Sequence, residues 1–335
     1  MSEPLAVGGL FELTVGVRSL EEAAAYWSRF GYTPGFVHTF LADEALHAYG
    51  VRSGLRSMRL LHGTSDHGLI RLMQWDAPVN DGIGLAPLRA LGSRWGAALN
   101  TNLLAVQSHA ESADEQGIAI RWLSSSRQDP AGPVAVPFLT ELVHVREMIV
   151  LRPETRQVLF QRLGYNNPSY GSVVEAAFPT SQITHVGLVT AGDPQRQVFF
   201  YERALGLLRT RDGSTSGASD MASRRIFDLA PDESYRCWDF DDPRSSSEPS
   251  KWLSGRLKFI HFDNAPLDDL RTLSRLGCLG MSAYTWRVRD LDTARTSCLT
   301  HGAAELSAIG SNELGERQWA FTAPDGYDWL LIETR

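Results

Sequence analysis

The sequence predicts an α+β fold made of two similar halves, and three observations lead to this prediction. The chain has 335 residues, which at roughly 100–200 residues per domain is the length of two domains. Each half holds a stretch that reads as a strand with alternating apolar residues ending in a turn, at 68–78 and 255–266. A strand, a turn and an amphipathic helix also recur four times, at 11–32, 102–118, 185–207 and 283–303.

In three of these four units, the residues at both ends of the helix fit helix termini. A serine or aspartate stands where the N-cap belongs, and a glycine follows the last turn. The pairs are Ser19 with Gly31, Asp193 with Gly206, and Asp290 with Gly302. The stretches between the units are rich in strand-forming residues, which completes an alternation of one helix with several strands.

Composition and charge exclude several classes of protein. The chain is 43% hydrophobic and 21% charged, as is ordinary for a globular protein, and no run of about 18 apolar residues predicts a membrane span. The three cysteines have no CxxC spacing, so we expect neither disulfides nor a structural zinc site, and the start of the chain shows no secretory signal. We therefore expect a cytoplasmic protein. The net charge of −7 has no basic cluster, which argues against nucleic acid as a partner.

The third unit carries the most specific motif. A histidine on the strand, an aspartate cap, an aromatic pair on the helix and a Leu-Gly at its end follow in order as His185, Asp193, Phe200–Tyr201 and Leu205–Gly206. Residues 321–333 read as a hairpin around a Pro-Asp-Gly turn, where glycine supplies the backbone conformation that a tight turn needs. This order of motifs resembles the vicinal oxygen chelate superfamily, which includes glyoxalases, bleomycin-resistance proteins and extradiol dioxygenases.

The resemblance implies four βαβββ modules that pair into two cup-shaped domains with mixed sheets. We expect modules one and two to form a first domain over 1–165, a linker at 166–181, and modules three and four to form a second domain over 182–335. By the repeat, the region of Gln74 is expected to superpose on that of His261. The resemblance leaves open whether the protein forms a homodimer.

In this superfamily, metal ligands come from the first and last strands of a module. Carried over to the second half, this implies His185 and His261 as ligands of one divalent metal, iron, manganese, zinc or nickel, or as general bases in a site without any cofactor. Tyr284 is the expected donor to an oxyanion. The first domain is expected to be metal-free and mainly structural, because Thr101 and Leu159 stand where two of its ligands would be.

Aromatic side chains of the second half are candidate walls for an apolar, oxygenated substrate. We expect Trp286, Tyr201 and Trp329 in this role, with Glu12 and Gln74 as candidates in the first cup. The alternative for the aromatic residues is an ordinary core position. The function expected is an isomerase, epimerase or lyase that works through an enolate or oxyanion on a small molecule. The alternatives are a non-catalytic, ligand-sequestering protein and a ring-cleaving dioxygenase.

Overall fold

The computed structural model describes residues 5–128, 143–216, 221–246, 248, 251–264 and 266–334. The chain folds into four modules, each with one helix after its first strand. Module one consists of β1 (Glu12–Gly16), α1 (Leu20–Ser28), β2 (Tyr32–Phe40), α2 (Ala42–Tyr49), β3 (Leu55–His62) and β4 (Leu69–Trp75). Module two consists of β5 (Arg94–Asn100), α3 (Leu103–Glu115), β6 (Arg121–Gln128), β7 (His144–Leu151) and β8 (Arg156–Leu163).

The second half of the chain repeats this order. Module three consists of β9 (Thr180–Thr190), α4 (Pro194–Leu205), β10 (Arg209–Ser216), α5 (Met221–Ile226), β11 (Ser234–Phe240) and β12 (Arg256–Phe262). Module four consists of β13 (Gly280–Val288), α6 (Leu291–Thr300), the short β14 (Ala304–Glu305) and β15 (Gly310–Ser311), β16 (Arg317–Thr322) and β17 (Asp328–Glu333). The side chains of the three expected N-caps accept hydrogen bonds from backbone N–H groups of their helices.

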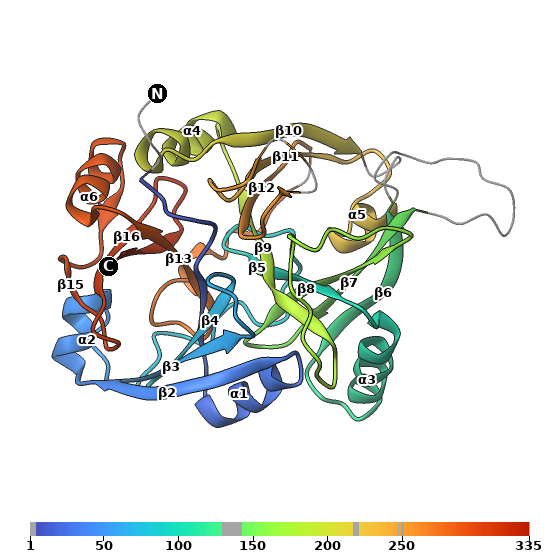
Figure 1. The fold of residues 1–335 in the computed structure, drawn as a ribbon, viewed down its shortest axis with the longest axis horizontal. Coiled ribbons are helices and arrows are strands. Elements are labelled where there is room, and N and C mark those ends of the chain that lie inside the picture. The colour runs from blue at the N-terminus through green and yellow to red at the C-terminus, as the bar shows by residue number, and fades with distance from the viewer. Residues whose placement is uncertain are drawn as a thin grey trace, which may run out of the picture.

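The modules pair differently from the sequence-based expectation. Sheet A has the order β14-β16-β17-β13-β1-β4-β3-β2, with β15 beside β16, and so joins module one to module four. Sheet C has the order β10-β11-β12-β9-β5-β8-β7-β6 and joins module two to module three. Figure 1 shows the blue and red ends of the chain together on one side of the molecule. The expected pairing of modules one with two and three with four is therefore wrong.

Two crossing segments make this pairing feasible. Residues 76–93 leave sheet A for sheet C, and residues 263–279 return from sheet C to sheet A. They meet at Leu91, whose N–H donates to the carbonyl of Asp268 at 2.9 Å and whose carbonyl accepts from Leu270 at 2.9 Å. The linker expected at 166–181 falls largely in residues 164–179, which connect two modules of the same sheet and bury Tyr170 and Phe178.

Each sheet has two unlike faces. The helix face of both sheets contributes to one continuous core with α1, α3, α4 and α6, as Val15, Val186 and Phe259 illustrate. We call the opposite face of each sheet its cup face. The strands β4 and β12 hold equivalent places in the two sheets, since Gln74 pairs with Arg56 and His261 pairs with Arg236. The repeat predicted around these two residues is thus confirmed.

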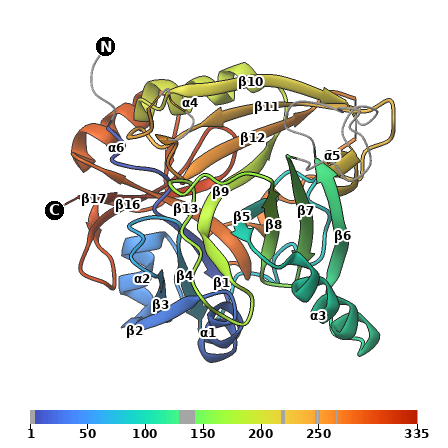
Figure 2. The ribbon, with the colours of Figure 1, turned by 45° about the vertical axis from the view of Figure 1, so that its right-hand side comes forward.

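Among the described residues, the helices are all too short or too polar to cross a lipid bilayer. The helices α1 and α3 lie at the lower end of the molecule in Figure 2, while α4 and α6 lie in its upper part. The two cup faces therefore remain the places where side chains of both partner modules can meet around a ligand.

Candidate functional site

The cup of sheet C brings His185 to the junction of its two modules. In the central strands, His185 pairs with Ala97 across the antiparallel boundary and with Arg256 in the parallel direction. Ala97 in turn pairs with Val158. Because laterally paired residues point to the same side of a sheet, these four side chains form one row on the cup face. His185 supplies the only ionisable ring in that row.

The imidazole of His185 is held in one orientation by its neighbour. Thr184 Oγ1 donates a hydrogen bond of 3.1 Å to the carbonyl of Ala97 and lies 3.0 Å from Nδ1 of His185. A hydroxyl has a single proton, so Thr184 accepts from a protonated Nδ1. The hydrogen-bond pattern thus leaves Nε2 unprotonated, with a lone pair available as a base or acceptor.

The electrostatic surroundings keep this imidazole neutral. Burial and the positive charges of Lys258, Arg256 and Arg162 lower the pKa of His185 well below its ordinary value. The ring of Phe160 lies 5.5 Å away and that of Tyr170 6.4 Å away, measured between ring centroids. At neutral pH the site therefore presents an uncharged base beside several cations and two aromatic rings.

Lys258 has only a distant carboxylate partner in this cup. Its Nζ lies 4.0 Å from Asp239, whereas Arg256 approaches Asp239 to 3.1 Å and also pairs with Asp241. Although burial favours the neutral amine, the Asp239 carboxylate helps to raise the pKa of Lys258 above its ordinary value. Burial raises the pKa of the Cys237 thiol to about 12, so the thiol beside Asp239 stays protonated.

A cavity of about 690 Å³ adjoins these groups. It runs between β10, β11 and the segment before β12, so Asp239 and Arg256 belong both to its wall and to the cup. Trp252 stands on its rim, with its ring 5.9 Å from the Arg256 guanidinium. The other lining residues are Leu208, Thr210, Arg211, Asp241, Asp242, Pro243, Ser245 and Ser246.

His261 does not join His185, which corrects the expected pair of ligands. His261 pairs with Thr190, five positions further along β9 than His185. At roughly 3.3 Å per residue the two positions are roughly 16 Å apart along the strands. The odd offset also turns the His261 imidazole to the helix face, where Nδ1 lies 3.3 Å from the carbonyl of Thr190.

The four aromatic candidates belong to the core of the helix face. Tyr284 is fully buried, and its hydroxyl donates to the carbonyl of Gly187 at 2.7 Å and accepts from the N–H of Trp95 at 3.1 Å. Trp286 and Trp329 stack with centroids 5.5 Å apart. The expectations that Tyr284 serves an oxyanion and that Trp286, Trp329 and Tyr201 line a pocket are wrong. Alternation puts the three strand side chains under the helices, and Tyr201 lies on the buried side of α4.

Tyr284 and Tyr201 nevertheless have a definite structural role. The Tyr284 hydroxyl lies between β5 and β9 and so ties module four of sheet A to sheet C. The Tyr201 hydroxyl donates to Asp325 at 2.7 Å, which joins α4 of module three to the turn before β17. These bonds hold the two sheets together in the core.

Glu12 faces the cup of sheet A, as expected, but the chain itself occupies its carboxylate. Arg71 approaches Glu12 to 2.6 Å, and Arg59 approaches it to 2.7 Å. Two carboxylates from the loop after β15 complete the network, since Glu313 lies 3.3 Å from Arg71 and Glu316 lies 2.7 Å from Arg59. Glu12, Arg71 and Glu313 have no exposed side-chain surface.

The rest of the sheet A cup is filled by a helix. Ala45, Ala48 and Tyr49 of α2 pack in one apolar cluster with cup-face residues that include Met73, Trp75, Ala283, Ala320 and Leu330. Gln74 lies on the other face, where it accepts from Arg56 at 3.1 Å and from the N–H of Leu20 at 3.4 Å. The expectation that Gln74 contacts a substrate in this cup is therefore wrong.

The ligand positions inferred for module two also shift. Thr101 lies beyond the end of β5 and is exposed, and Leu159 belongs to the core of the helix face. Ala97 and Val158 stand in the row of His185 instead. Neither can bind a metal, and the described residues contain no group of three or more His, Cys, Asp or Glu side chains placed to hold one. The donors present thus fit a single imidazole site rather than a metal centre.

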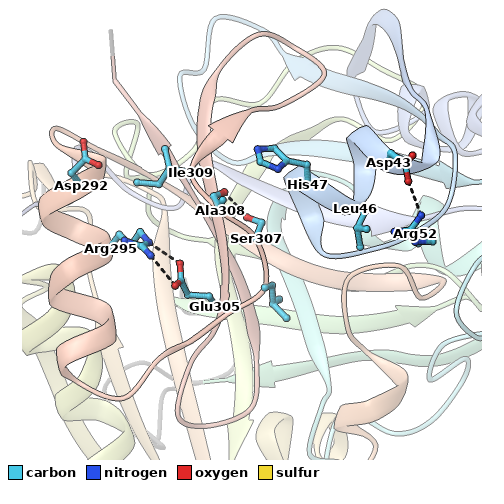
Figure 3. Close-up of a pocket in the computed structure, with 11 residues that line it drawn as sticks. Asp43, Leu46, His47, Arg52, Asp292, Arg295, Glu305, Ser307, Ala308 and Ile309 are labelled. Carbon is cyan, nitrogen blue, oxygen red and sulfur yellow. Dashed lines mark hydrogen bonds and ion pairs between the residues drawn. The ribbon is translucent and has the colours of Figure 1, made fainter.

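A wide cleft of about 1010 Å³ opens between α2 and module four, away from both cups. Figure 3 shows that four of its charged side chains bond in pairs: Asp43 to Arg52 at 2.7 Å, and Arg295 to Glu305 at 2.7 Å. Those four side chains are all exposed to solvent by more than a third. The cleft therefore offers a ligand no desolvated charge, unlike the cup of sheet C.

The comparisons with known proteins follow this geometry. Glyoxalase I from Zea mays aligns with a TM-score of 0.53 and 14% identity, over 97% of this chain and 92% of that chain. A protein from Bacillus subtilis subsp. subtilis str. 168 with a provisional dioxygenase name aligns with a TM-score of 0.55 and 9% identity, over 99% of this chain and 86% of that chain. This chain has the vicinal oxygen chelate fold. The sequence matches no protein-family model and no curated protein.

Within the vicinal oxygen chelate fold, sequence reasoning missed several residues of the sheet C cup. A signal for two of them was present in the strand 256–262, where Arg256 and Lys258 alternate with Leu257 and Phe259. The apolar pair belongs under the helices, so the charged pair has to face the cup. The sequence offers no comparable signal for Asp239 and Tyr170. Asp239 lies on β11, next to β12, and Tyr170 lies in the segment between β8 and β9.

Proposed function

We propose that the sheet C cup is the working site of an isomerase, epimerase or lyase that moves a proton next to a carbonyl group. The observation that carries this proposal is the neutral, oriented imidazole of His185 in a cationic cup. A general base has to be unprotonated and within reach of the proton it removes, and an enolate needs nearby positive charge. The remainder of the vicinal oxygen chelate fold serves to hold these groups at the junction of modules two and three.

In the proposed reaction, Nε2 of His185 removes the proton from the carbon beside the carbonyl. The electron pair of that C–H bond forms a C=C bond, and the carbonyl electrons move to its oxygen. The side chain of Lys258, which is a positively charged ammonium group at neutral pH, donates a hydrogen bond from Nζ to the resulting enolate. Return of the proton from His185 to the other face or another atom gives an isomer, and loss of a neighbouring leaving group gives the lyase product.

The cup favours a substrate with an anionic group and an apolar part. Arg162 lies over the rings of Phe160 at 5.5 Å and Tyr170 at 5.3 Å, so an arginine and two aromatic faces approach the same space as His185. A carboxylate pairs well with a guanidinium fork. The rings suit an apolar body that lies against them. Short 2-oxo carboxylates with an aromatic or branched side chain meet these requirements.

The proposed chemistry uses no metal step. The row at the centre of the cup offers one imidazole, while Arg256, Ala97 and Val158 cannot serve as ligands. The nearby positive charges of Lys258 and Arg162 also oppose a divalent cation. We predict that dialysis against a chelator leaves the exchange activity described below unchanged. A loss of activity that added iron, manganese, zinc or nickel restores would contradict the metal-free mechanism.

The direct test is proton exchange measured in D₂O. Phenylpyruvate and 2-oxobutyrate are incubated with the protein, and the loss of the C3 proton signal is followed by NMR above the uncatalysed rate. We expect faster exchange with wild-type protein for the substrate that carries the ring. His185→Gln is expected to remove the enhancement. The control is Glu305→Gln, which breaks only an exposed ion pair with Arg295 and is expected to retain it.

The second candidate is a protein that binds such a molecule without transforming it. The cavity of about 690 Å³ beside Trp252 and Arg256 favours this alternative, because an aromatic rim and a guanidinium are sufficient for binding alone. The same samples distinguish the two. Saturable binding of phenylpyruvate, measured by calorimetry, with no proton exchange for either compound would support sequestration over catalysis.

A further inference from the structure

A second, separate crevice of about 270 Å³ lies between α1 and α3. These two helices lie side by side at the lower end of the molecule in Figure 2. The floor of the crevice is apolar, with Phe30, Val106, Ala110, Val150 and Phe178 buried around it. The remaining lining residues are Tyr26, Arg29, His109, Ala113, Ile118, Ile120 and Arg152.

The charged groups that line this crevice are all basic. The Arg29 guanidinium lies 5.1 Å from the ring centroid of Phe178, and that of Arg152 lies 4.4 Å from that of Tyr26. No aspartate or glutamate lines the crevice. The adjacent hollow holds two acidic side chains, Glu22 and Glu154, and Glu154 already accepts bonds from Arg18. Neither of them lines the crevice itself. Within the described part of the chain, Arg29 and Arg152 therefore keep their ion-pairing capacity for another partner.

We propose that this crevice binds a small monocarboxylate with an apolar, ring-containing or branched body. The body would lie against Phe30, Val106 and Phe178, and the carboxylate would meet the two guanidinium groups at the rim. Guanidinium–carboxylate pairs combine charge with two parallel hydrogen bonds, and removal of the apolar body from water supplies the rest of the affinity. Charge complementarity selects an anion over a neutral molecule of the same shape.

The position of the crevice gives such a ligand a structural effect. The helix α1 belongs to module one and therefore to sheet A, whereas α3 belongs to module two and to sheet C. A molecule between them contacts one module of each sheet. Because it binds the folded arrangement and not the unfolded chain, it raises the melting temperature as its concentration exceeds its dissociation constant.

The test uses 2-naphthoate and its neutral counterpart 2-naphthylmethanol, titrated by calorimetry into the full chain. The double substitution Arg29→Gln with Arg152→Gln is expected to weaken naphthoate binding at least tenfold and to leave the alcohol unaffected. Ala110→Phe fills the crevice and is expected to abolish binding of both. The control is Arg203→Gln, which removes a similar arginine from the exposed ring of Phe199, 5.4 Å away, and is expected to change nothing.

The sheet C cup also attracts anions, so Lys258→Gln separates the two sites. Crevice binding is expected to persist in that variant, together with the rise in melting temperature. The proposal is overturned if naphthoate binds the double arginine variant and Ala110→Phe as tightly as wild type, or if Lys258→Gln alone removes all binding. The arginine substitutions lie at the surface, so they keep the test valid even if Ala110→Phe disturbs the fold.

Discussion

The cups of sheets A and C share one strand order and differ in how their positive charge is neutralised. In sheet A, Arg59 and Arg71 are met by three carboxylates of the same chain, and α2 fills the remaining space. In sheet C, Lys258 stands 4.0 Å from a carboxylate that Arg256 approaches more closely. An apolar cluster that includes Ile226 of α5 fills part of the sheet C cup, much as α2 does in sheet A. The two cups therefore differ in their ion pairs: one holds a closed network, and the other keeps cationic capacity beside a neutral base.

This difference teaches that the same fold position can serve stability in one half and binding in the other. A buried charge whose partner is removed is costly, because the remaining charge has lost both water and its counter-charge. A partly exposed charge can lose its partner to a ligand at little cost. The four predictions below test this division, beginning with the largest expected effect.

Arg71→Met is expected to lower the free energy of unfolding by about 3–5 kcal/mol, because it leaves Glu12 and Glu313 buried without their shared partner. The matched substitution in the other cup, Lys258→Met, is expected to lower it by about 1 kcal/mol or less. Urea unfolding followed by circular dichroism measures both. Equal losses would contradict the division between a structural and a binding cup.

The sheet A network is expected to weaken in acid. Although burial alone raises it, Arg59 and Arg71 lower the pKa of Glu316 to about 2, from an ordinary 4.5. A lowered acid pKa contributes stability above the unfolded value, and this contribution is lost as the pH falls from 4.5 through 2. Glu316→Gln should therefore remove about 2–3 kcal/mol at pH 7 and little near pH 2.

The control for this pH series is Glu305→Gln, which breaks an exposed pair with Arg295. Its effect is expected to be small at every pH. Urea unfolding at pH 7, 4.5 and 3 measures the two variants in parallel. A constant difference between Glu316→Gln and wild type across this range would show that the carboxylate charge is not what stabilises the cup.

His185→Gln is expected to slow proton exchange from phenylpyruvate at least about a hundredfold, since a positioned base contributes roughly 10²–10⁴-fold. Its melting temperature should stay close to that of wild type, because His185 is only partly buried and is bonded to a single side chain. Exchange by NMR and thermal unfolding are measured on the same preparation. Unchanged exchange would place the chemistry elsewhere.

Thr184→Val is expected to slow the exchange about tenfold, the equivalent of about 1.4 kcal/mol, because the imidazole loses the acceptor that selects its tautomer. Thr184→Ser keeps the hydroxyl and is expected to restore most of the rate. A structural role alone would not distinguish valine from serine in this way. The readout is the exchange rate over a range of pH, at fixed substrate.

Much of the local structure could be predicted from the sequence. The helix caps at Ser19, Asp193 and Asp290 and the equivalence of β4 and β12 follow from residue types and alternation. The partner of each module could not be predicted, because a strand pattern records which face is apolar but not which other strand lies beside it.

The errors at the site have the same origin. The motif positions of His185 and His261 predict that the two side chains meet. Their actual register is set by the parallel pairing of β9 with β12, which separates them by five positions. One residue of register exchanges the two faces of a strand, which is why His261 and Tyr284 lie under the helices. Lys258 can be predicted from alternation: if Leu257 and Phe259 face the helices, Lys258 between them must face the cup.

The pairing of modules one and four also sets an order of events during synthesis. Glu12 and Thr285, neighbours across the boundary of sheet A, are 273 positions apart in the chain. All strands of sheet C lie between them, at 94–262. Of the four modules, module one is synthesised first, yet its sheet is completed last. The edge of β1 that pairs with β13 stays unpaired while sheet C forms. Modules two and three are thus enclosed in the sequence between modules one and four, and sheet A is completed only when the hairpin of β16 and β17 has been made.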